Sequence, residues 1–268
     1  MIGPTIAEAM AWYFSSVLYL LMPPLVGVVF LITWTALFAW RLMIRPGAHR
    51  ATPDDVGLRP IGRSVPWLVV AILTAVILYL SFILASDHLF PHEAPSWDYF
   101  AKYNARAWGW AATTLVTVVV APLMEEFIFR GVVQHALVRR FGPVVGISGA
   151  ALLFSMIHLR PRQLADFFVF GAASGLLVYR TRSLWAGIAT HSTINGCILL
   201  LAQKPDLPFV GNNHSATPLW GSVAVAVAAA MAFIALLSRI HSAPVAAPAA
   251  MLDSNTVAPS DAPPIALG

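Results

Sequence analysis

The sequence predicts an all-α, polytopic membrane protein, a helical bundle of about seven transmembrane helices with an intramembrane polar cavity. Of the 268 residues, 59% are hydrophobic and only 10% are charged, and the mean hydropathy is +0.76. A soluble domain carries about a quarter charged residues to solvate its surface. This composition therefore points to lipid as the main solvent and argues against a water-soluble enzyme.

Several apolar windows reach or approach the length of roughly 20 residues that a membrane-crossing helix needs. The first is too long for a signal-peptide core and no Lys or Arg precedes it, so we expect it to remain as a span. The fourth and fifth windows are short and hold polar groups, so we expect them to be tilted, broken or shielded by neighbouring helices. The expected spans are Met10–Trp40, Pro66–Ser86, Trp108–Phe129, Pro143–His158, Leu164–Tyr179, Leu184–Ala202 and Leu219–Leu237.

The basic residues act as topology signals. The net charge is +4, but the Lys and Arg side chains fall between apolar segments, so no nucleic-acid partner is expected. The loop Arg41–Ser64 is rich in arginine, whereas the loop Asp87–Ala107 holds only Lys102 and Arg106. The positive-inside bias then places the first loop in the cytoplasm and the N-terminus outside. We expect an integral, multi-pass protein of the lipid bilayer, in the plasma (inner) membrane if the host is bacterial.

The chain divides into four expected regions. Residues 1–107 form an N-terminal transmembrane region, residues 108–202 a core, and residues 203–240 a C-terminal span. Residues 241–268 are rich in Ala and Pro and lack helical periodicity, which predicts a disordered tail. The single cysteine, Cys197, allows neither an intramolecular disulfide nor a four-cysteine metal site.

Only three acidic residues, Glu125, Glu126 and Asp166, fall in or beside the expected spans. Ionisable groups at membrane depth are costly and usually face a cavity or a partner, so these positions lead the search for function. Asp166 lies in the first turn of its segment, where a carboxylate interacts favourably with the helix N-terminus. We therefore expect a structural role for Asp166.

Helical geometry separates the two adjacent glutamates. Glu126 and Arg130 are four residues apart and can pair, while Glu125 points about 100° away. The run could be an ion pair that snorkels at a helix end, but that interpretation leaves Glu125 without a local partner in an apolar segment. Loss of water around an unpaired carboxylate raises its affinity for a proton, toward the range that is useful for a general base.

Two further segments carry polar side chains at membrane depth. His158 ends the fourth span, and His191 and Asn195 share one face of the sixth. Separately, these residues are explained by a helix cap and by interhelical hydrogen bonds. Together with Glu125 they supply an acid/base, a proton carrier and two hydrogen-bonding groups on three helices. The serines and Cys197 lack a nucleophile-elbow pattern or an activating base, so a serine or cysteine hydrolase is not supported.

These motifs, in this order, resemble the CAAX-protease and bacteriocin-processing (CPBP) family of intramembrane endopeptidases, also called Abi or Rce1-like proteins. The first family motif, two glutamates followed by three residues and an arginine, matches Glu125 to Arg130. The second, a phenylalanine and a histidine separated by three residues, matches Phe154 to His158, and the third matches His191 to Asn195. The resemblance covers about Trp108–Ala202.

The resemblance implies a helical membrane peptidase with a polar cavity, acting on a membrane-associated protein or peptide. By this resemblance, Glu125 and His158 of this chain would activate a water, and His191 and Asn195 would stabilise the oxyanion at the scissile carbonyl. Glu126 and Arg130 would support the site. No cofactor is expected, although a glutamate and two histidines can also hold zinc. We favour the metal-free mechanism because a zincin-type spacing is lacking and because the resemblance favours it.

One geometric difficulty accompanies this interpretation. If the third span ends near Phe129 and the fourth at His158, Glu125 and His158 lie a membrane apart. We expect the third helix to continue through about Arg140, which places Glu125 near mid-depth, because Gly131–Arg139 contains no proline.

Two functions of other classes stay open. A non-catalytic membrane scaffold or immunity-type binding protein would use the same polar cavity to bind a partner, although a binder need not keep the whole set of motifs. A transporter would use Glu125 as a proton relay. Inverted-repeat hydropathy would support a transporter, and the sequence does not have it.

Overall fold

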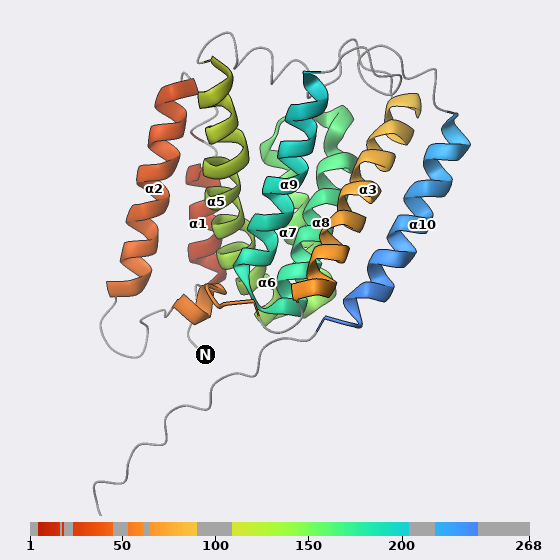
Figure 1. Cartoon of the computed structure of the whole chain (residues 1–268). Helices are drawn as coiled ribbons and strands as arrows, with labels where there is room; N and C mark the ends of the chain where they lie inside the picture. The colour runs from red at the N-terminus through yellow and green to blue at the C-terminus, as the bar shows by residue number, and fades with distance from the viewer. Residues whose placement is uncertain are drawn as a thin grey trace, which may run out of the picture.

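The computed structural model describes residues 5–16, 18, 24–44, 53–61, 65–89, 109–203 and 218–240. These residues form helices and short connections and contain no β-strand, so the all-α prediction is confirmed (Figure 1). The separate helices are α1 (Ile6–Ser16), α2 (Pro24–Ile44), α3 (Val65–Leu89), α7 (Pro143–Ile157), α8 (Leu164–Thr181), α9 (Leu184–Ala202) and α10 (Leu219–Leu237). The predicted disordered tail lies outside the described residues.

One continuous helix runs over Gly109–Phe141. It contains α5 (Ala121–Glu126) and α6 (His135–Phe141), together with two π-helical stretches, η4 (Leu115–Val120) and η5 (Phe127–Gln134). The prediction that the third helix continues well past Phe129 is therefore confirmed. Glu125 lies midway along this helix, so it is far from both ends of the bundle.

Five helices are long and apolar enough to cross a membrane, namely Val65–Leu89, Gly109–Phe141, Pro161–Thr181, Leu184–Ala202 and Leu219–Leu237. Two shorter apolar helical stretches, Val29–Leu42 and Pro143–Ile157, accompany them. The chain is an integral, multi-pass membrane protein, and the total of about seven spans stays a prediction.

The first expected span is wrong in detail, because the apolar run forms two antiparallel helices, α1 and α2. The ring centroids of Trp12 and Phe38 lie 4.4 Å apart, and Glu8 and Arg41 line the same groove between the two helices. Pro24 begins α2, since proline fits the first turn of a helix but cannot donate within its interior. The start of α1 therefore lies at the Arg41 end of the bundle, opposite to the predicted place of the N-terminus.

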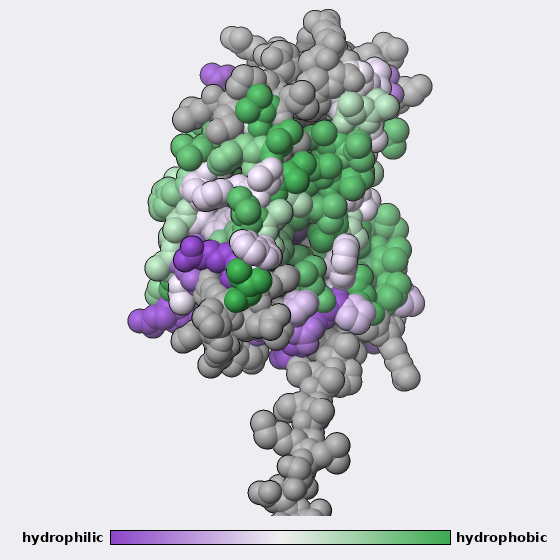
Figure 2. All heavy atoms as spheres, turned by 90° about the vertical axis from the view of Figure 1, so that its left-hand side faces the viewer, coloured by the Kyte–Doolittle hydropathy of each residue, from purple (hydrophilic) through white to green (hydrophobic). Residues whose placement is uncertain are grey.

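The arginine-rich connections gather at one end of the bundle. The carbonyl of Gly57, whose φ of +79° suits glycine, accepts a 2.7 Å hydrogen bond from the Leu184 N–H at the start of α9. Arg180, near the end of α8, donates to the Leu237 carbonyl at the end of α10. Figure 2 shows apolar side chains across the middle of one face and strongly hydrophilic ones toward its lower end. This grouping agrees with the positive-inside prediction.

Small residues bring the central helices close together. A Cβ added to Gly171 of α8 would lie 3.0 Å from the Ala151 Cα of α7, and one added to Gly146 would lie 2.5 Å from Val138. Small residues at helix contacts in lipid let backbones approach and let short polar side chains reach across. The polar site is built at these contacts.

Candidate functional site

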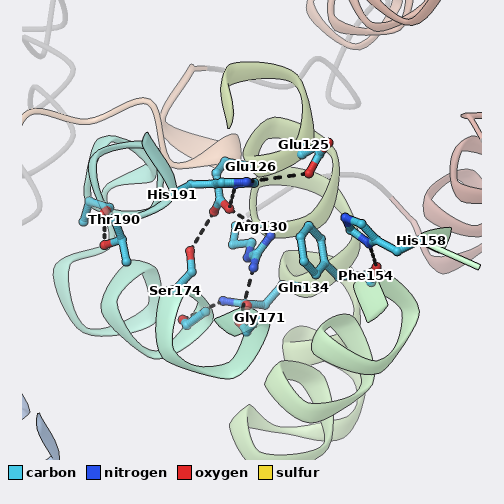
Figure 3. A network of polar contacts seen from close by, with 12 residues as sticks. Glu125, Glu126, Arg130, Gln134, Phe154, His158, Gly171, Ser174, Thr190 and His191 are labelled. Carbon is cyan, nitrogen blue, oxygen red and sulfur yellow. Dashed lines mark hydrogen bonds and ion pairs between the residues drawn. The ribbon is translucent and has the colours of Figure 1, made fainter. Parts of the chain in front are cut away.

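A buried ion pair forms the centre of the site (Figure 3). The Glu126 Oε1 and Arg130 Nη1 atoms are 2.9 Å apart, and the two side chains are 0% and 1% exposed. Arg130 Nη2 also donates to the Gly171 carbonyl at 3.3 Å, and its guanidinium lies 4.7 Å from the centroid of the Phe154 ring. The predicted Glu126–Arg130 pairing is present. Such a pair is sustained in a low-dielectric interior only when further hydrogen bonds satisfy both charges.

Helices α8 and α9 complete the environment of the Glu126 carboxylate. Its Oε2 accepts a 2.8 Å hydrogen bond from the Ser174 hydroxyl, and its Oε1 lies 3.0 Å from His191 Nδ1. A Cβ on Gly187 would lie 2.5 Å from Oε2, so only glycine leaves room for the carboxylate at that point. Glu126 is thus fixed from three directions, which leaves it little freedom to act on a substrate.

Glu125 is the more accessible of the two glutamates. Because a carboxylate only accepts, His191 Nδ1 must carry the hydrogen shared with Glu126, and Nε2 is the ring atom that faces Glu125. The distance from Nε2 to Glu125 Oε2 is 3.8 Å, longer than a hydrogen bond. The Glu125 side chain is 14% exposed, against 0% for Glu126. Glu125 therefore has the acceptor atoms that a ligand or water can reach.

His158 lies just after the end of α7. Its Nδ1 is 2.8 Å from the Phe154 carbonyl and donates to it, which leaves Nε2 as the atom able to accept a proton. The imidazole stacks on Phe167 with ring centroids 3.9 Å apart, and the next residue, Leu159, has a φ of +51°. Among the residues that the structure describes, His158 and Glu125 share no hydrogen bond or ion pair. The Phe154 ring, which contacts both Arg130 and His158, links His158 to the ion pair.

Asn195 bonds to the backbone of the long helix. Its Nδ2 donates to the Thr117 carbonyl at 2.9 Å. That carbonyl has no donor in its own helix, because the Ala121 N–H bonds Val116 in the π-helical stretch and Pro122 has no N–H. An amide nitrogen carries two hydrogens, so one remains for another acceptor. Asn195 lies one turn beyond His191 on α9.

The structure thus brings Glu125, Glu126, Arg130 and His191 into direct contact. His158 is connected to these residues through the Phe154 ring, and Asn195 through its hydrogen bond to the Thr117 carbonyl of the long helix. Asp166, expected to have a structural role, lies in the first turn of α8, about two turns before Ser174 and outside this network.

Sequence reasoning missed Ser174, which was considered only as a nucleophile, and Gln134, whose Nε2 donates to the Gly175 carbonyl at 3.0 Å. The signal that could have found Ser174 is its place between Gly171 and Gly175 on one helix face. Small and polar residues at this spacing predict a close interhelical contact.

No group of three or more His, Cys, Asp or Glu side chains is arranged to hold a metal ion in the described parts of the chain.

Two comparisons with known proteins each match about a third of the chain. Residues 107–197 match the family described as type II CAAX prenyl endopeptidase Rce1-like. Over 91 residues the chain is 24% identical to YdiL of Bacillus subtilis (strain 168), a protein whose name assigns it, provisionally, as a membrane peptidase. That match covers 34% of this chain and 37% of the relative, so the chain spans just over a third of the relative's length. No solved structure matches the chain.

Proposed function

We propose, because residues 107–197 match the Rce1-like family, that this chain is an intramembrane endopeptidase that cleaves membrane-associated proteins or peptides. One observation carries the proposal beyond the family resemblance. Glu125 is a partly accessible carboxylate, and a fully buried ion pair fixes the imidazole that faces it. This is the arrangement that water activation in an apolar environment needs.

In the proposed reaction, Glu125 acts as general base and His158 Nε2 is a second proton acceptor for the bound water. A water loses a proton to this pair while its oxygen bonds to the scissile carbonyl carbon. The carbonyl oxygen becomes an oxyanion that accepts hydrogen bonds from Asn195 and from His191 Nε2, which carries a hydrogen in the doubly protonated imidazolium; each bond is worth about 2.7–4 kcal/mol in a preorganised site. The C–N bond then breaks, and the stored proton passes to the leaving amine.

Glu126 and Arg130 are positioning residues in this proposal. Glu126 Oε1 holds the Nδ1 side of His191, which turns Nε2 toward Glu125. Arg130 balances the charge of Glu126 and packs on Phe154, which lies next to His158. The fixed ion pair orients two groups of the site without touching the substrate, as a carboxylate orients the histidine in other hydrolases.

The test compares new protein termini in membrane fractions of host cells that carry the wild-type chain or Glu125→Gln, at equal folded abundance. Because removal of a general base costs on the order of 10²–10⁴ in rate, the wild-type termini should disappear. Asp166→Asn is the matched control, since it neutralises another buried carboxylate of the bundle outside the site. Unchanged termini, with Glu125→Gln still complementing a deletion, would overturn the enzyme proposal and favour a non-catalytic scaffold or immunity-type binding protein.

The metal question has its own test. Under the metal-free mechanism, cleavage continues after exhaustive chelation. Loss of cleavage on chelation, with recovery on addition of zinc, would replace the general-base mechanism with a metal-activated water.

A further inference from the structure

Two threonine hydroxyls of the long helix lack the partner that threonine usually finds in a helix. A threonine inside a helix commonly donates to the carbonyl four residues back. The residues that do so here are Thr74, Thr114, Thr181, Thr190 and Thr193. The hydroxyls of Thr113 and Thr117 are buried and have no hydrogen-bond partner within the described ranges. Thr35 shares this property but lies on α2, away from the long helix.

A buried hydroxyl without a partner is unfavourable, so two of them on one helix call for a polar ligand. Thr113 is 0% exposed, which rules out bulk solvent as its partner. The ligand must be small enough to reach hydroxyls that are buried against a packed helix. A water molecule meets these requirements chemically, because it both donates and accepts and needs only two to four polar neighbours.

The positions of these hydroxyls along the long helix indicate a path for the ligand from one end of the bundle toward Glu125. Thr113 lies four residues after Gly109, where the long helix begins, at the end of the bundle opposite the arginine-rich connections. Thr117 follows one turn later, then Ala121 with a small side chain, and then Glu125, so the four positions follow one side of the helix. At 1.5 Å per residue, Thr113 and Glu125 are about 18 Å apart along the axis.

Asn195 adds a further polar group at the Thr117 level. Its bond to the Thr117 carbonyl brings the amide beside the row of hydroxyls, one turn from His191. Thr113 and Thr117 are about 6 Å apart along the helix axis, which two hydrogen bonds through one water span, whereas Thr117 and Glu125 are about 12 Å apart, so this step takes more than one water.

We propose that Thr113, Thr117 and Asn195 form a water-binding track that supplies the hydrolytic water to Glu125 from the end of the bundle where the long helix begins. The track rests on the proposed function, since only a hydrolase consumes water at this site. The track gives the hydrolytic water a route to the site, because the apolar surroundings would otherwise exclude water.

Thiol labelling tests the track without any need for proteolysis. In a Cys197→Ala background, Thr113→Cys and Thr117→Cys are exposed to a small water-soluble methanethiosulfonate. The matched controls are Thr114→Cys and Val119→Cys, which lie at similar depths on an exposed side of the same helix. Thiols react as thiolates, which form only in water, so the track positions should be labelled at least about tenfold faster than their controls. Equal or slower labelling of the track positions would overturn the proposal.

Cleavage kinetics supply the second test. Thr117→Val keeps the shape and removes the hydroxyl, so we expect a lower kcat with an unchanged KM, rescue by Thr117→Ser, and no change in Thr114→Val. A fall in kcat that Thr117→Ser does not rescue would contradict the track. If the track thiols are labelled while Glu125→Gln still cleaves, the proposed function fails and the track stands as a hydrated path. If the track thiols are protected in a chain that needs Glu125 for cleavage, the track alone fails.

Discussion

The centre of the bundle and its α3–α10 edge are held together by different means. At the centre, Glu126 receives hydrogen bonds or ion pairs from residues of α8, α9 and its own helix. At the edge, the buried residues of α10 are small or apolar, namely Ser222, Ala226, Ala229, Phe233 and Leu237. Apolar burial between helices gains little in lipid, so the edge depends on shape and the centre on polar contacts that fix atom positions. Substitutions that keep volume but remove polarity should therefore harm only the centre.

The largest effect should come from Arg130→Met, which leaves Glu126 buried without its counter-charge. Breaking one partner of a buried ion pair costs about 3–5 kcal/mol of folding free energy. Thermal unfolding in mild detergent measures the loss. The double variant Glu126→Gln with Arg130→Met should recover part of it, because no uncompensated charge remains. A double variant less stable than Arg130→Met would show that the ion pair is not what holds the centre.

Ser174→Ala should come next, because it removes a hydrogen bond to a buried carboxylate, worth about 1.5–3 kcal/mol. The control is Ser155→Ala, which is equally buried but bonds only the Ala151 carbonyl of its own helix. Ser174→Ala should also slow cleavage, since Glu126 orients His191. Equal unfolding temperatures for the two variants would remove Ser174 from the site.

Gly187→Ala tests the space beside Glu126. The added methyl group would lie 2.5 Å from Glu126 Oε2 and 2.7 Å from Val178 Cγ2, so the carboxylate must move. Overpacking of this kind costs typically about 1–3 kcal/mol. Gly196→Ala on the same helix is the matched control, because the nearest atom to its Cβ would be 4.0 Å away. If both variants unfold at the wild-type temperature, the contact at Gly187 is looser than the structure indicates.

The elements that sequence periodicity predicted best are the apolar spans with clear ends. The spans Leu184–Ala202 and Leu219–Leu237 coincide with α9 and α10. The run Met10–Trp40 misled, because hydropathy alone does not register a proline pair inside an apolar stretch. Hydropathy did not predict where the third helix ends. That prediction came from the requirement that Glu125 and His158 share one site and from the absence of proline in Gly131–Arg139.

For the site, spacing within one helix predicted the Glu126–Arg130 pair, since an i,i+4 contact is a property of local sequence. The contact of Ser174 with Glu126 joins residues 48 positions apart, and no local pattern encodes it. The same holds for Asn195 and the Thr117 carbonyl, which becomes an acceptor only because a π-helical stretch and Pro122 remove its donor. Such contacts depend on which helices become neighbours.

The smallest effect should come from the lipid-facing side of α10, where Ile234 is 64% exposed. Ile234→Ala exchanges contacts with lipid for other contacts with lipid, so the folding free energy should change by less than about 0.5 kcal/mol. The adjacent Phe233 is 2% exposed and belongs to a buried apolar cluster with residues of α3 and α8, so Phe233→Ala should lower the unfolding temperature clearly. If Ile234→Ala destabilised the protein as much as Phe233→Ala, that side of α10 would be covered by protein and not by lipid. The α3–α10 edge would then be a protein interface. The edge and the polar centre could no longer be contrasted as a part that faces lipid and a part that is surrounded by protein.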